Sequence, residues 1–222
     1  MEAHEHRIRV PRTARYFQLG ELAQARRLWL VCHGYGQLAP YFIRHFRLAA
    51  ELVPGTVVVA PEGLSKFYLQ GNGGRVGASW MTSEDRLTEI EDYSAYLDQL
   101  LARLRAECPA DVLVTVLGFS QGATTVSRWL LRSTFVPDHL VLWAGTFPTD
   151  VEPAAAAALL RSLPRLSFVC GDSDSYLPEA RVHEHLAWLR QHGARPEAVR
   201  FEGTHELKSE LISHLAQQDN NQ

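Results

Sequence analysis

One serine, placed between an apolar run and a helical pattern, most constrains the fold of this chain. Residues 112–117 form an apolar, β-branched run that is typical of a buried strand. Residues 118–122 then read Gly-Phe-Ser-Gln-Gly around Ser120, and residues 123–131 carry a helical pattern. A strand, a tight turn that holds a serine, and a helix make up a nucleophile elbow, in which flanking glycines leave room for a strained turn. The pattern predicts a catalytic serine, and an ordinary strand-to-helix turn is the alternative.

Strands and helices alternate along the rest of the chain. Continuous apolar strands that alternate with helices are typical of a mostly parallel sheet covered on both faces. We therefore expect an α/β fold, as a single domain over residues 1–222. The predicted strands are residues 15–19, 28–32, 56–60, 139–143, 165–170 and 198–201, and the predicted helices are residues 41–52, 84–106, 153–160, 178–191 and 205–216.

Two segments depart from this alternation. Residues 62–82 are polar and rich in glycine, which predicts a long irregular loop that serves as a substrate-binding loop or lid. Ser83, which follows this loop, has the residue type of an N-cap for the helix at residues 84–106. Residues 217–222 are polar and predict a flexible tail.

Composition argues against several classes of protein. A net charge of −3 without a basic tract disfavours nucleic acid as a partner. No segment reaches the roughly 18 apolar residues of a membrane helix, and the first 15 residues lack the apolar core of a signal peptide. We expect a cytoplasmic protein, monomer or homodimer, without metal or cofactor. Its three cysteines, Cys32, Cys108 and Cys170, are expected to be free thiols.

A nucleophilic serine needs a base, and the base needs an acid that orients it. In open α/β sheets such groups lie on loops that follow the carboxyl ends of strands. The predicted strand at residues 165–170 leads into a loop with Asp172 and Asp174, and the one at residues 198–201 leads into a loop with His205. The sequence therefore offers His205 as the base and either aspartate as the acid.

Four blocks resemble the phospholipase/carboxylesterase family of the α/β-hydrolase superfamily, which includes acyl-protein thioesterases and small bacterial carboxylesterases. They span almost the whole chain, and the block around Ser120 matches the family motif G-F-S-Q-G letter for letter. The resemblance implies the α/β-hydrolase fold and a serine hydrolase that cleaves carboxylic esters or thioesters without a cofactor. The blocks are His33-Gly34-Tyr35-Gly36, Gly118–Gly122, Gly171-Asp172-Ser173-Asp174 and Glu202-Gly203-Thr204-His205.

The resemblance also implies a role for each residue of a triad. Ser120 is the nucleophile, His205 is the general base, and Asp174 is the acid, because the family uses the second aspartate of its acid loop. The family usually has proline at the next position, where this chain has Ser175. Asp172 therefore stays open as the alternative acid.

Further site residues surround the candidate nucleophile. The backbone N–H of Gln121, next to Ser120, is expected to be one oxyanion donor, and the resemblance implies the N–H of Tyr35 as the other. His33 is expected to hydrogen-bond to backbone and shape that loop. In the resembled family, a tryptophan in this region of the chain lies near the acyl pocket. Trp80 is therefore a candidate substrate-binding residue, and anchoring of its loop to the core is the alternative.

The expected partner is a small-molecule acyl ester. A lysophospholipase or a peptidase on the same fold is the alternative enzyme, because neither the fold nor the triad fixes the substrate. A non-catalytic binding protein on a hydrolase scaffold is the alternative from another class, and its signature would be a missing triad residue. All three triad residue types are present here.

Overall fold

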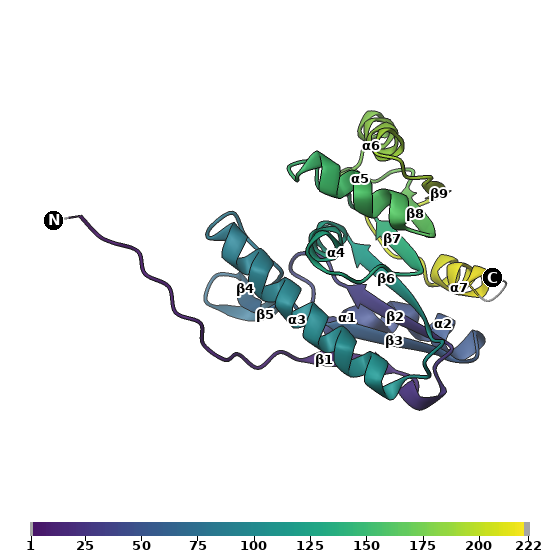
Figure 1. Ribbon diagram of the computed structural model, residues 1–222, viewed down its shortest axis with the longest axis horizontal. Helices are drawn as coiled ribbons and strands as arrows, with labels where there is room; N and C mark the ends of the chain where they lie inside the picture. The colour runs from purple at the N-terminus through teal and green to yellow at the C-terminus, as the bar shows by residue number, and fades with distance from the viewer. Residues whose placement is uncertain (1, 220–222) are drawn as a thin grey trace.

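A seven-stranded sheet forms the centre of the computed structural model, which describes residues 2–219 (Figure 1). The strands of this sheet are β1 (Tyr16–Leu19), β2 (Arg27–Cys32), β3 (Thr56–Pro61), β6 (Leu113–Phe119), β7 (His139–Trp143), β8 (Arg165–Gly171) and β9 (Glu197–Phe201). Their spatial order is β1-β3-β2-β6-β7-β8-β9. Only β1 pairs antiparallel with its neighbour, and the other five pairs are parallel. The predicted mostly parallel α/β architecture is confirmed.

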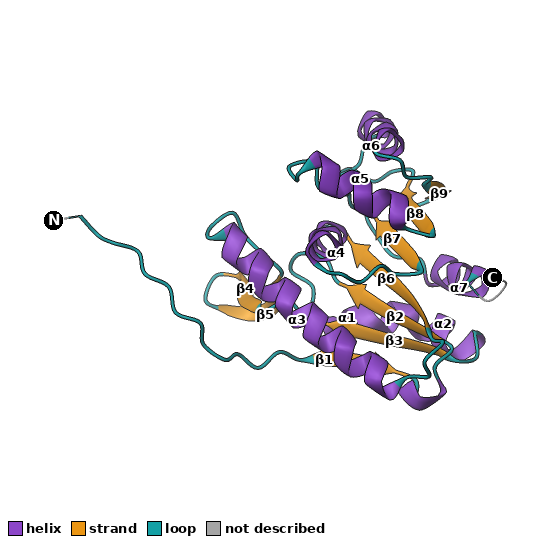
Figure 2. Ribbon diagram, in the orientation of Figure 1, coloured by secondary structure: helices purple, strands orange, loops and turns teal. Residues whose placement is uncertain are grey.

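Helices cover both faces of the sheet (Figure 2). Apolar side chains of α3, α4, α5 and α6 join one buried core, and those of α1, η2, α2 and α7 join the other. The helices are η1 (Leu22–Gln24), α1 (Ala39–Phe42), η2 (Ile43–Phe46), α2 (Arg47–Leu52), α3 (Arg86–Glu107), α4 (Gln121–Arg132), α5 (Pro153–Ser162), α6 (Glu179–Gln191) and α7 (Ser209–Gln218), where η marks a short 3₁₀ helix.

The continuous apolar runs of the sequence follow from this double cover. All six residues of β2 are buried, and from Leu28 to Cys32 they alternate between the two cores. Leu28 and Leu30 pack under α3 and α4, whereas Trp29 and Val31 pack toward α1 and η2. A strand buried on both faces cannot alternate apolar with polar residues, so it reads as an unbroken apolar run.

The parallel strands place the predicted site residues along one edge. Strands β2, β6, β8 and β9 run in the same direction, so the loops that follow them meet at the carboxyl edge of the sheet. Those loops carry Tyr35, Ser120, Asp174 and His205.

The expectation of an irregular loop over residues 62–82 is wrong. Strands β4 (Ser65–Gln70) and β5 (Gly73–Ser79) form an antiparallel hairpin there, apart from the main sheet (Figure 1). Gly71 begins the two-residue turn with a φ of +58°, a value that suits glycine in a hairpin turn. Gly71 lies in the turn, and Gly63 and Gly77 allow close approach of neighbouring backbone. Because glycine is typical of loops, these residues made the strands difficult to predict from the sequence.

Several element boundaries also differ from the prediction. The helix expected at residues 41–52 is split into α1, η2 and α2. Asp85, with a φ of +46°, stands before α3, so Ser83 is not its N-cap. Helix α7 begins at Ser209 instead of at His205, which lies in the preceding loop. This loop lets His205, which follows β9, reach toward Ser120, which follows β6.

The C-terminal prediction is partly wrong. Gln217 and Gln218 belong to α7, and Asp219 is buried and hydrogen-bonded to His139. The remainder of the predicted tail, residues 220–222, lies outside the described residues. The three cysteines are free, as predicted. Among the described helices, none combines the length and the apolarity that a membrane span requires.

Candidate active site

Ser120 lies at a strained turn between β6 and α4. Its φ of 54° and ψ of −116° fall in a region that residues with a side chain rarely adopt. A Cβ on Gly118 would overlap the carbonyl oxygen of Gly122, and one on Gly122 would overlap the carbonyl oxygen of Cys32. The Ser120 N–H donates to the carbonyl of Trp143 on β7 at 2.8 Å. These contacts fix the turn and leave the hydroxyl at the edge of the sheet.

His205 connects Ser120 to Asp174. Its Nε2 lies 2.9 Å from Ser120 Oγ, and its Nδ1 lies 2.8 Å from Asp174 Oδ2. These distances suit the tautomer in which Nδ1–H donates to the carboxylate and Nε2 accepts from the hydroxyl. Three side chains from loops after β6, β8 and β9 thus form one hydrogen-bonded chain.

The structure brings Asp174, and not Asp172, to the histidine. The Asp174 carboxylate is fully buried, and its Oδ1 accepts from the Tyr176 N–H at 2.9 Å. Asp172 is exposed, and it pairs with Arg200 of β9 at 2.9 Å. The two aspartates differ in task, because Asp172 fastens its loop to β9 while Asp174 holds His205.

The loop that carries His205 is held from two sides. The Trp143 indole N–H donates to the Glu206 carbonyl at 2.8 Å, which fixes the backbone next to the histidine. The rings of Phe119 and Tyr176 pack against the imidazole, with centroids 5.0 and 4.6 Å away. Tyr176 is 67% exposed, so its ring forms part of the outer wall of the site.

Two backbone N–H groups remain available near Ser120. In the part of the chain that the structure describes, the N–H groups of Tyr35 and Gln121 have no hydrogen-bond partner. Gln121 opens α4, so its N–H also lies at the positive end of the helix dipole. Both amides follow strand ends beside Ser120, which is the placement an oxyanion hole requires.

Buried side chains hold the Tyr35 loop in place. His33 Nδ1–H donates to the Gly34 carbonyl at 2.7 Å, and Nε2 accepts from the Gly63 N–H at 3.0 Å. Burial lowers the pKa of His33 to about 4, so the ring stays neutral and can accept that bond. The Gln37 amide oxygen accepts from the Gly34 N–H at 2.8 Å. The expected backbone bonding of His33 is confirmed.

Sequence reasoning missed the part that the Gln121 side chain plays. Its amide oxygen accepts from the Trp80 N–H at 3.2 Å, and its amide nitrogen donates to the Met81 carbonyl at 2.8 Å. The residue after the nucleophile therefore fastens the end of the hairpin to the start of α4. No local pattern announces this bond, because its partners lie 40 residues apart.

Glu62 is a second residue that the sequence did not reveal. Its buried carboxylate pairs with Arg15 at 2.6 Å and with Lys66 of the hairpin at 3.3 Å, and it accepts from the Ala39 N–H at 3.3 Å. Burial alone would raise the pKa of Glu62, but hydrogen bonds and charges from Arg15 and Lys66 hold it below its usual value. This carboxylate joins β1, α1 and the base of the hairpin.

Trp80 lies in the core beneath the Tyr35 loop. The indole is 2% exposed, its N–H donates to the His33 carbonyl at 2.9 Å, and its ring lies 5.1 Å from the His33 ring. Its edge meets the ring of Tyr93 on α3. These contacts are those of an anchor for the hairpin, one of the two roles that the sequence left open.

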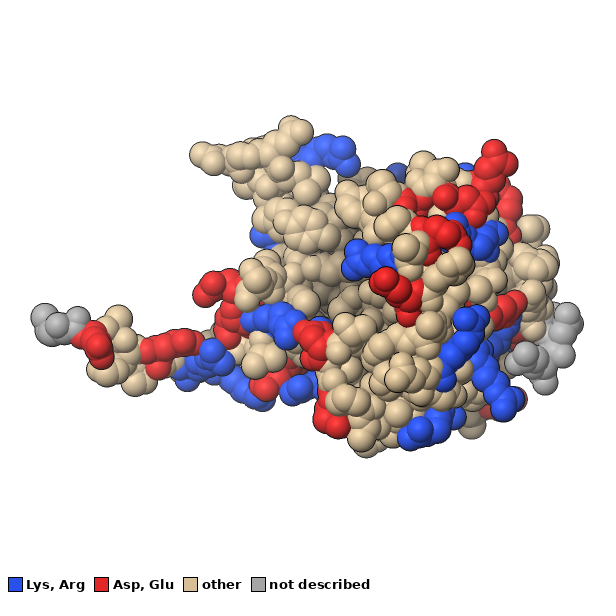
Figure 3. All heavy atoms as spheres, turned by 90° about the horizontal axis from the view of Figure 1, so that it is seen from above, with Lys and Arg blue, Asp and Glu red and all other residues tan. Residues whose placement is uncertain are grey.

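The hairpin adds an apolar flank to the site. The Tyr35 ring, 59% exposed, packs against the Phe67 ring of β4 with centroids 5.1 Å apart, and the Leu69 side chain lies over Gly36. In Figure 3 an arm with few charged atoms projects from the body, where Figure 1 places this hairpin. Within residues 2–219, no group of three or more His, Cys, Asp or Glu is arranged to hold a metal ion.

Solved structures of known proteins share this fold. An esterase named PE8 is 22% identical, with a TM-score of 0.68 over 94% of this chain and 98% of its own. A carboxylesterase from Mesorhizobium loti is 20% identical, with a TM-score of 0.71 over 94% and 95%. Acyl-protein thioesterase 2 from Zea mays is 17% identical, with a TM-score of 0.70 over 94% and 99%. The predicted α/β-hydrolase fold is confirmed.

Sequence comparison identifies the family. No curated protein matches the chain at a significant level. A family model described as "Serine hydrolase (FSH1)" matches residues 25–207, a range that holds every strand after β1 and each of the residues discussed above as a candidate for the triad or the oxyanion hole. The chain therefore belongs to the FSH1 family of serine hydrolases.

Proposed function

We propose that this serine hydrolase cleaves carboxylic esters or thioesters through an acyl-enzyme intermediate. The observation that carries the proposal is the pair of His205 contacts, 2.9 Å to Ser120 Oγ and 2.8 Å to Asp174 Oδ2, at a strained turn before a helix. A serine hydroxyl is a poor nucleophile at neutral pH unless a base removes its proton during attack.

The first half-reaction acylates the serine. Ser120 Oγ attacks the carbonyl carbon while His205 Nε2 takes its proton, and Asp174 stabilises the imidazolium that forms. The N–H groups of Tyr35 and Gln121 stabilise the oxyanion of the tetrahedral intermediate, and loss of one such donor typically costs about 3 kcal/mol of activation free energy. Collapse breaks the bond to the alcohol or thiol, which leaves with the proton from His205.

The second half-reaction regenerates the serine. His205 takes a proton from water as the water oxygen attacks the acyl carbonyl of Ser120. The second tetrahedral intermediate uses the same two N–H donors. Its collapse returns the proton to Ser120 Oγ and releases the carboxylic acid, so each cycle consumes one ester and one water.

Rapid-mixing kinetics with p-nitrophenyl butyrate test the proposal. Where deacylation is slower than acylation, acyl-enzyme formation gives a burst of p-nitrophenol equal to the enzyme concentration. The same ester with added hydroxylamine should yield the hydroxamate, because a second nucleophile traps the acyl group. Absence of turnover on p-nitrophenyl esters and acyl thioesters alike would contradict the proposal. Turnover confined to lysophospholipids or aminoacyl amides would favour the other enzymes of this fold.

A further inference from the structure

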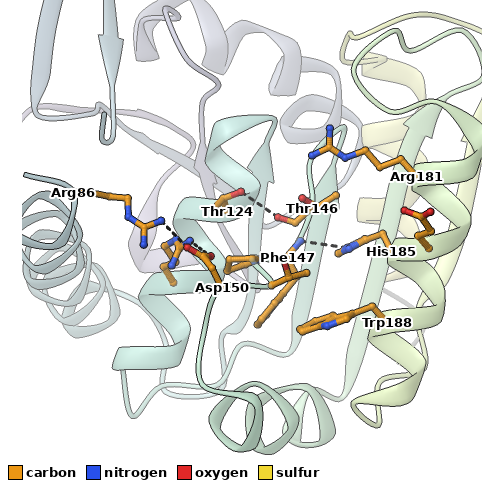
Figure 4. Close-up of a pocket in the computed structure, with 12 residues that line it drawn as sticks. Arg86, Thr124, Thr146, Phe147, Asp150, Arg181, His185 and Trp188 are labelled. Atoms are coloured by element: carbon orange, nitrogen blue, oxygen red, sulfur yellow. Dashed lines mark hydrogen bonds and ion pairs between the residues drawn. The ribbon is translucent and has the colours of Figure 1, made fainter. Parts of the chain in front are cut away.

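A pocket beside the candidate triad has no part in the mechanism above. It has a volume of about 590 Å³ and lies between α4, the loop after β7 and α6, with Arg86 of α3 at the side opposite α6 (Figure 4). This volume lies in the range of sites for small molecules. Its wall combines aromatic rings with cationic groups. Phe147 and Trp188 are the aromatic residues, and Arg86, Arg128 and Arg181 are the cationic ones.

Positive charge exceeds negative charge in this pocket. Arg86 and Arg128 share one carboxylate, that of Asp150, so this group of three keeps one unbalanced positive charge. The Arg128 side chain is 8% exposed, and its Nε has no hydrogen-bond partner among the described residues. No described carboxylate forms an ion pair with Arg181, which hydrogen-bonds to the Tyr176 carbonyl at 3.3 Å. A buried donor without a partner is costly, and a bound acceptor would relieve that cost.

The acidic residues and the histidine of the pocket do not remove this excess. Glu184 lies on the lining one turn after Arg181, and it contributes one negative charge. His185 is buried, and its Nε2 accepts from the Phe147 N–H at 3.3 Å. Burial, together with the charge of Arg181, lowers the pKa of His185 to about 4, so it adds no charge at neutral pH. Three arginines against Asp150 and Glu184 leave the pocket cationic.

Contacts through Tyr176 and Gly145 link the pocket to the candidate triad. Arg181 bonds to the backbone of Tyr176, whose ring packs on the imidazole of His205. Thr146, on the pocket wall, follows Gly145, where a Cβ would overlap the Ser120 carbonyl oxygen. Figure 4 shows the Arg181 side chain reaching from α6 toward Thr146.

This position assigns the two flanks of the site to different parts of a substrate. The leaving group of an ester must lie near His205 Nε2, because His205 gives it a proton. The cationic pocket is on that side. The Tyr35 loop and the hairpin, with Phe67 and Leu69, offer apolar surface beside the oxyanion hole instead. An anionic leaving group would meet Arg181, and an uncharged acyl chain would meet the hairpin.

We propose that the preferred substrates carry a carboxylate or a phosphate on the alcohol or thiol part of the ester, and that Arg181 binds this anion in the pocket. The guanidinium presents a planar fork of donors that matches both kinds of anion. This inference rests on the proposed esterase function and narrows its substrate class. It leaves the acyl part uncharged.

The test compares three phenyl butyrates that differ only at the position para to the ester oxygen. One carries a carboxylate, one a phosphate and one a neutral carboxamide. The readout is the ratio of kcat/KM for each anionic ester to that for the carboxamide. Different phenols leave at different rates, so the informative quantity is the change of this ratio between the wild type and each variant.

The Arg181→Gln variant should lower this ratio about five- to tenfold, since it removes a partly solvated charge-assisted contact. Arg181→Glu should lower it further. Arg190→Gln is the matched control, because Arg190 lies on α6 but outside the pocket. The kcat/KM ratio of this variant should equal that of the wild type. High salt should weaken the wild-type preference by screening. The anionic ester whose kcat/KM ratio changes more between the wild type and the Arg181 variants identifies the anion that the pocket prefers.

Two results would overturn the inference while leaving the esterase function intact. One is hydrolysis of all three esters with a ratio that neither Arg181 variant changes. The other concerns mono-p-nitrophenyl glutarate, whose free carboxylate lies on the acyl part. If the Arg181 variants lower kcat/KM for this ester more than for the anionic phenyl butyrates, the pocket binds the acyl chain instead. Failure of the esterase function itself would look different, as no ester would be turned over.

Discussion

Within residues 2–219, two Ser–His–Asp chains lie at opposite edges of one sheet. At the carboxyl edge His205 lies 2.9 Å from Ser120 and 2.8 Å from Asp174. At the amino edge His139, the first residue of β7, lies 2.9 Å from Ser167 Oγ through Nε2 and 3.0 Å from Asp219 through Nδ1. In residue types, ring nitrogens and distances the two chains are nearly the same.

Their surroundings differ in every respect that chemistry needs. Ser167 is 0% exposed inside β8, and His139 is 2% exposed, so no substrate can approach. The carboxylate of Asp219 is also held by Arg165 at 2.8 Å and by Thr115 at 3.0 Å. These bonds join α7 to the amino ends of three strands, β6, β7 and β8, so the second chain has a structural task.

The comparison shows what separates a candidate nucleophile from a serine that only forms a buried hydrogen bond. Ser120 occupies a turn with φ of 54°, reaches the surface, and precedes a helix whose first N–H is free, whereas Ser167 lies within a strand. Hydrogen-bond geometry is common to both. Of the two, only the chain of Ser120 has access to solvent, a strained turn and a backbone N–H without a hydrogen-bond partner next to its serine. Substitutions at the two edges should therefore affect different quantities.

The largest difference is expected between the two serines. Ser120→Ala should lower kcat on p-nitrophenyl butyrate about a millionfold, because the nucleophile is lost, with little change in stability. Ser167→Ala should leave activity per folded molecule unchanged and cost about 1–3 kcal/mol of unfolding free energy, because it leaves His139 Nε2 without its partner. Steady-state kinetics and urea denaturation measure both. A millionfold loss of turnover in Ser167→Ala would break the comparison.

The next effect concerns the two aspartates of the acid loop. Asp174→Asn should lower kcat about 10⁴-fold, since the amide favours the wrong His205 tautomer. Asp172→Asn is the matched control, two residues away, and it removes only an exposed ion pair with Arg200 worth at most about 1 kcal/mol. Kinetics at neutral pH compare them. Equal losses of kcat, or a greater loss in Asp172→Asn, would reassign the acid.

A third effect belongs to the amino edge alone. Asp219→Asn removes the charge that Arg165 and His139 share, and it should cost on the order of 3 kcal/mol of unfolding free energy. Activity per folded molecule should not change. The exposed Asp92 of α3 provides the control, because Asp92→Asn should stay within about 0.5 kcal/mol of the wild type. A wild-type unfolding curve for Asp219→Asn would show that the second chain does not hold the fold.

The smallest effect of a single residue is on stability in acid. Burial lowers the pKa of His33 and of His185 to about 4, whereas an unfolded histidine has a pKa near 6.5. Between these values the unfolded chain binds protons that the folded protein does not, so stability falls as pH falls from about 6.5 toward 4. Each residue should account for about 2 kcal/mol between pH 7 and 5. His185→Gln should reduce the pH dependence of urea unfolding, and an unchanged slope would contradict this origin.

Local patterns predicted the carboxyl edge well and the amino edge poorly. The elbow at Ser120 combines an apolar strand, a glycine on each side and a helix within one short segment, so its geometry is encoded locally. His139, by contrast, has neither a serine nor an acid nearby in sequence; its partners lie 28 and 80 residues away. Asp219 falls in a polar segment that reads as a loose tail. Burial of its carboxylate depends on strands that only the tertiary fold brings together.

The hairpin illustrates a second limit. Most residues of its strands face solvent, so they show no buried apolar run, and its glycines read as a loop. The Gln121 amide that secures it lies 40 residues from its partner Met81, and the buried Glu62 carboxylate that binds Lys66 also binds Arg15, 47 residues from Glu62. Sequence alone could not supply these contacts, so it could not separate an anchoring Trp80 from one that lines a pocket.

Labelling by a fluorophosphonate, read by peptide mass spectrometry, tests the central claim most directly. The reagent phosphonylates a serine only where a base activates it and oxyanion donors stabilise the adduct. We predict a single adduct on Ser120, formed equally by the Ser167→Ala variant and absent from Ser120→Ala. An adduct on Ser167, or the absence of any adduct on Ser120 in the folded wild type, would contradict the account.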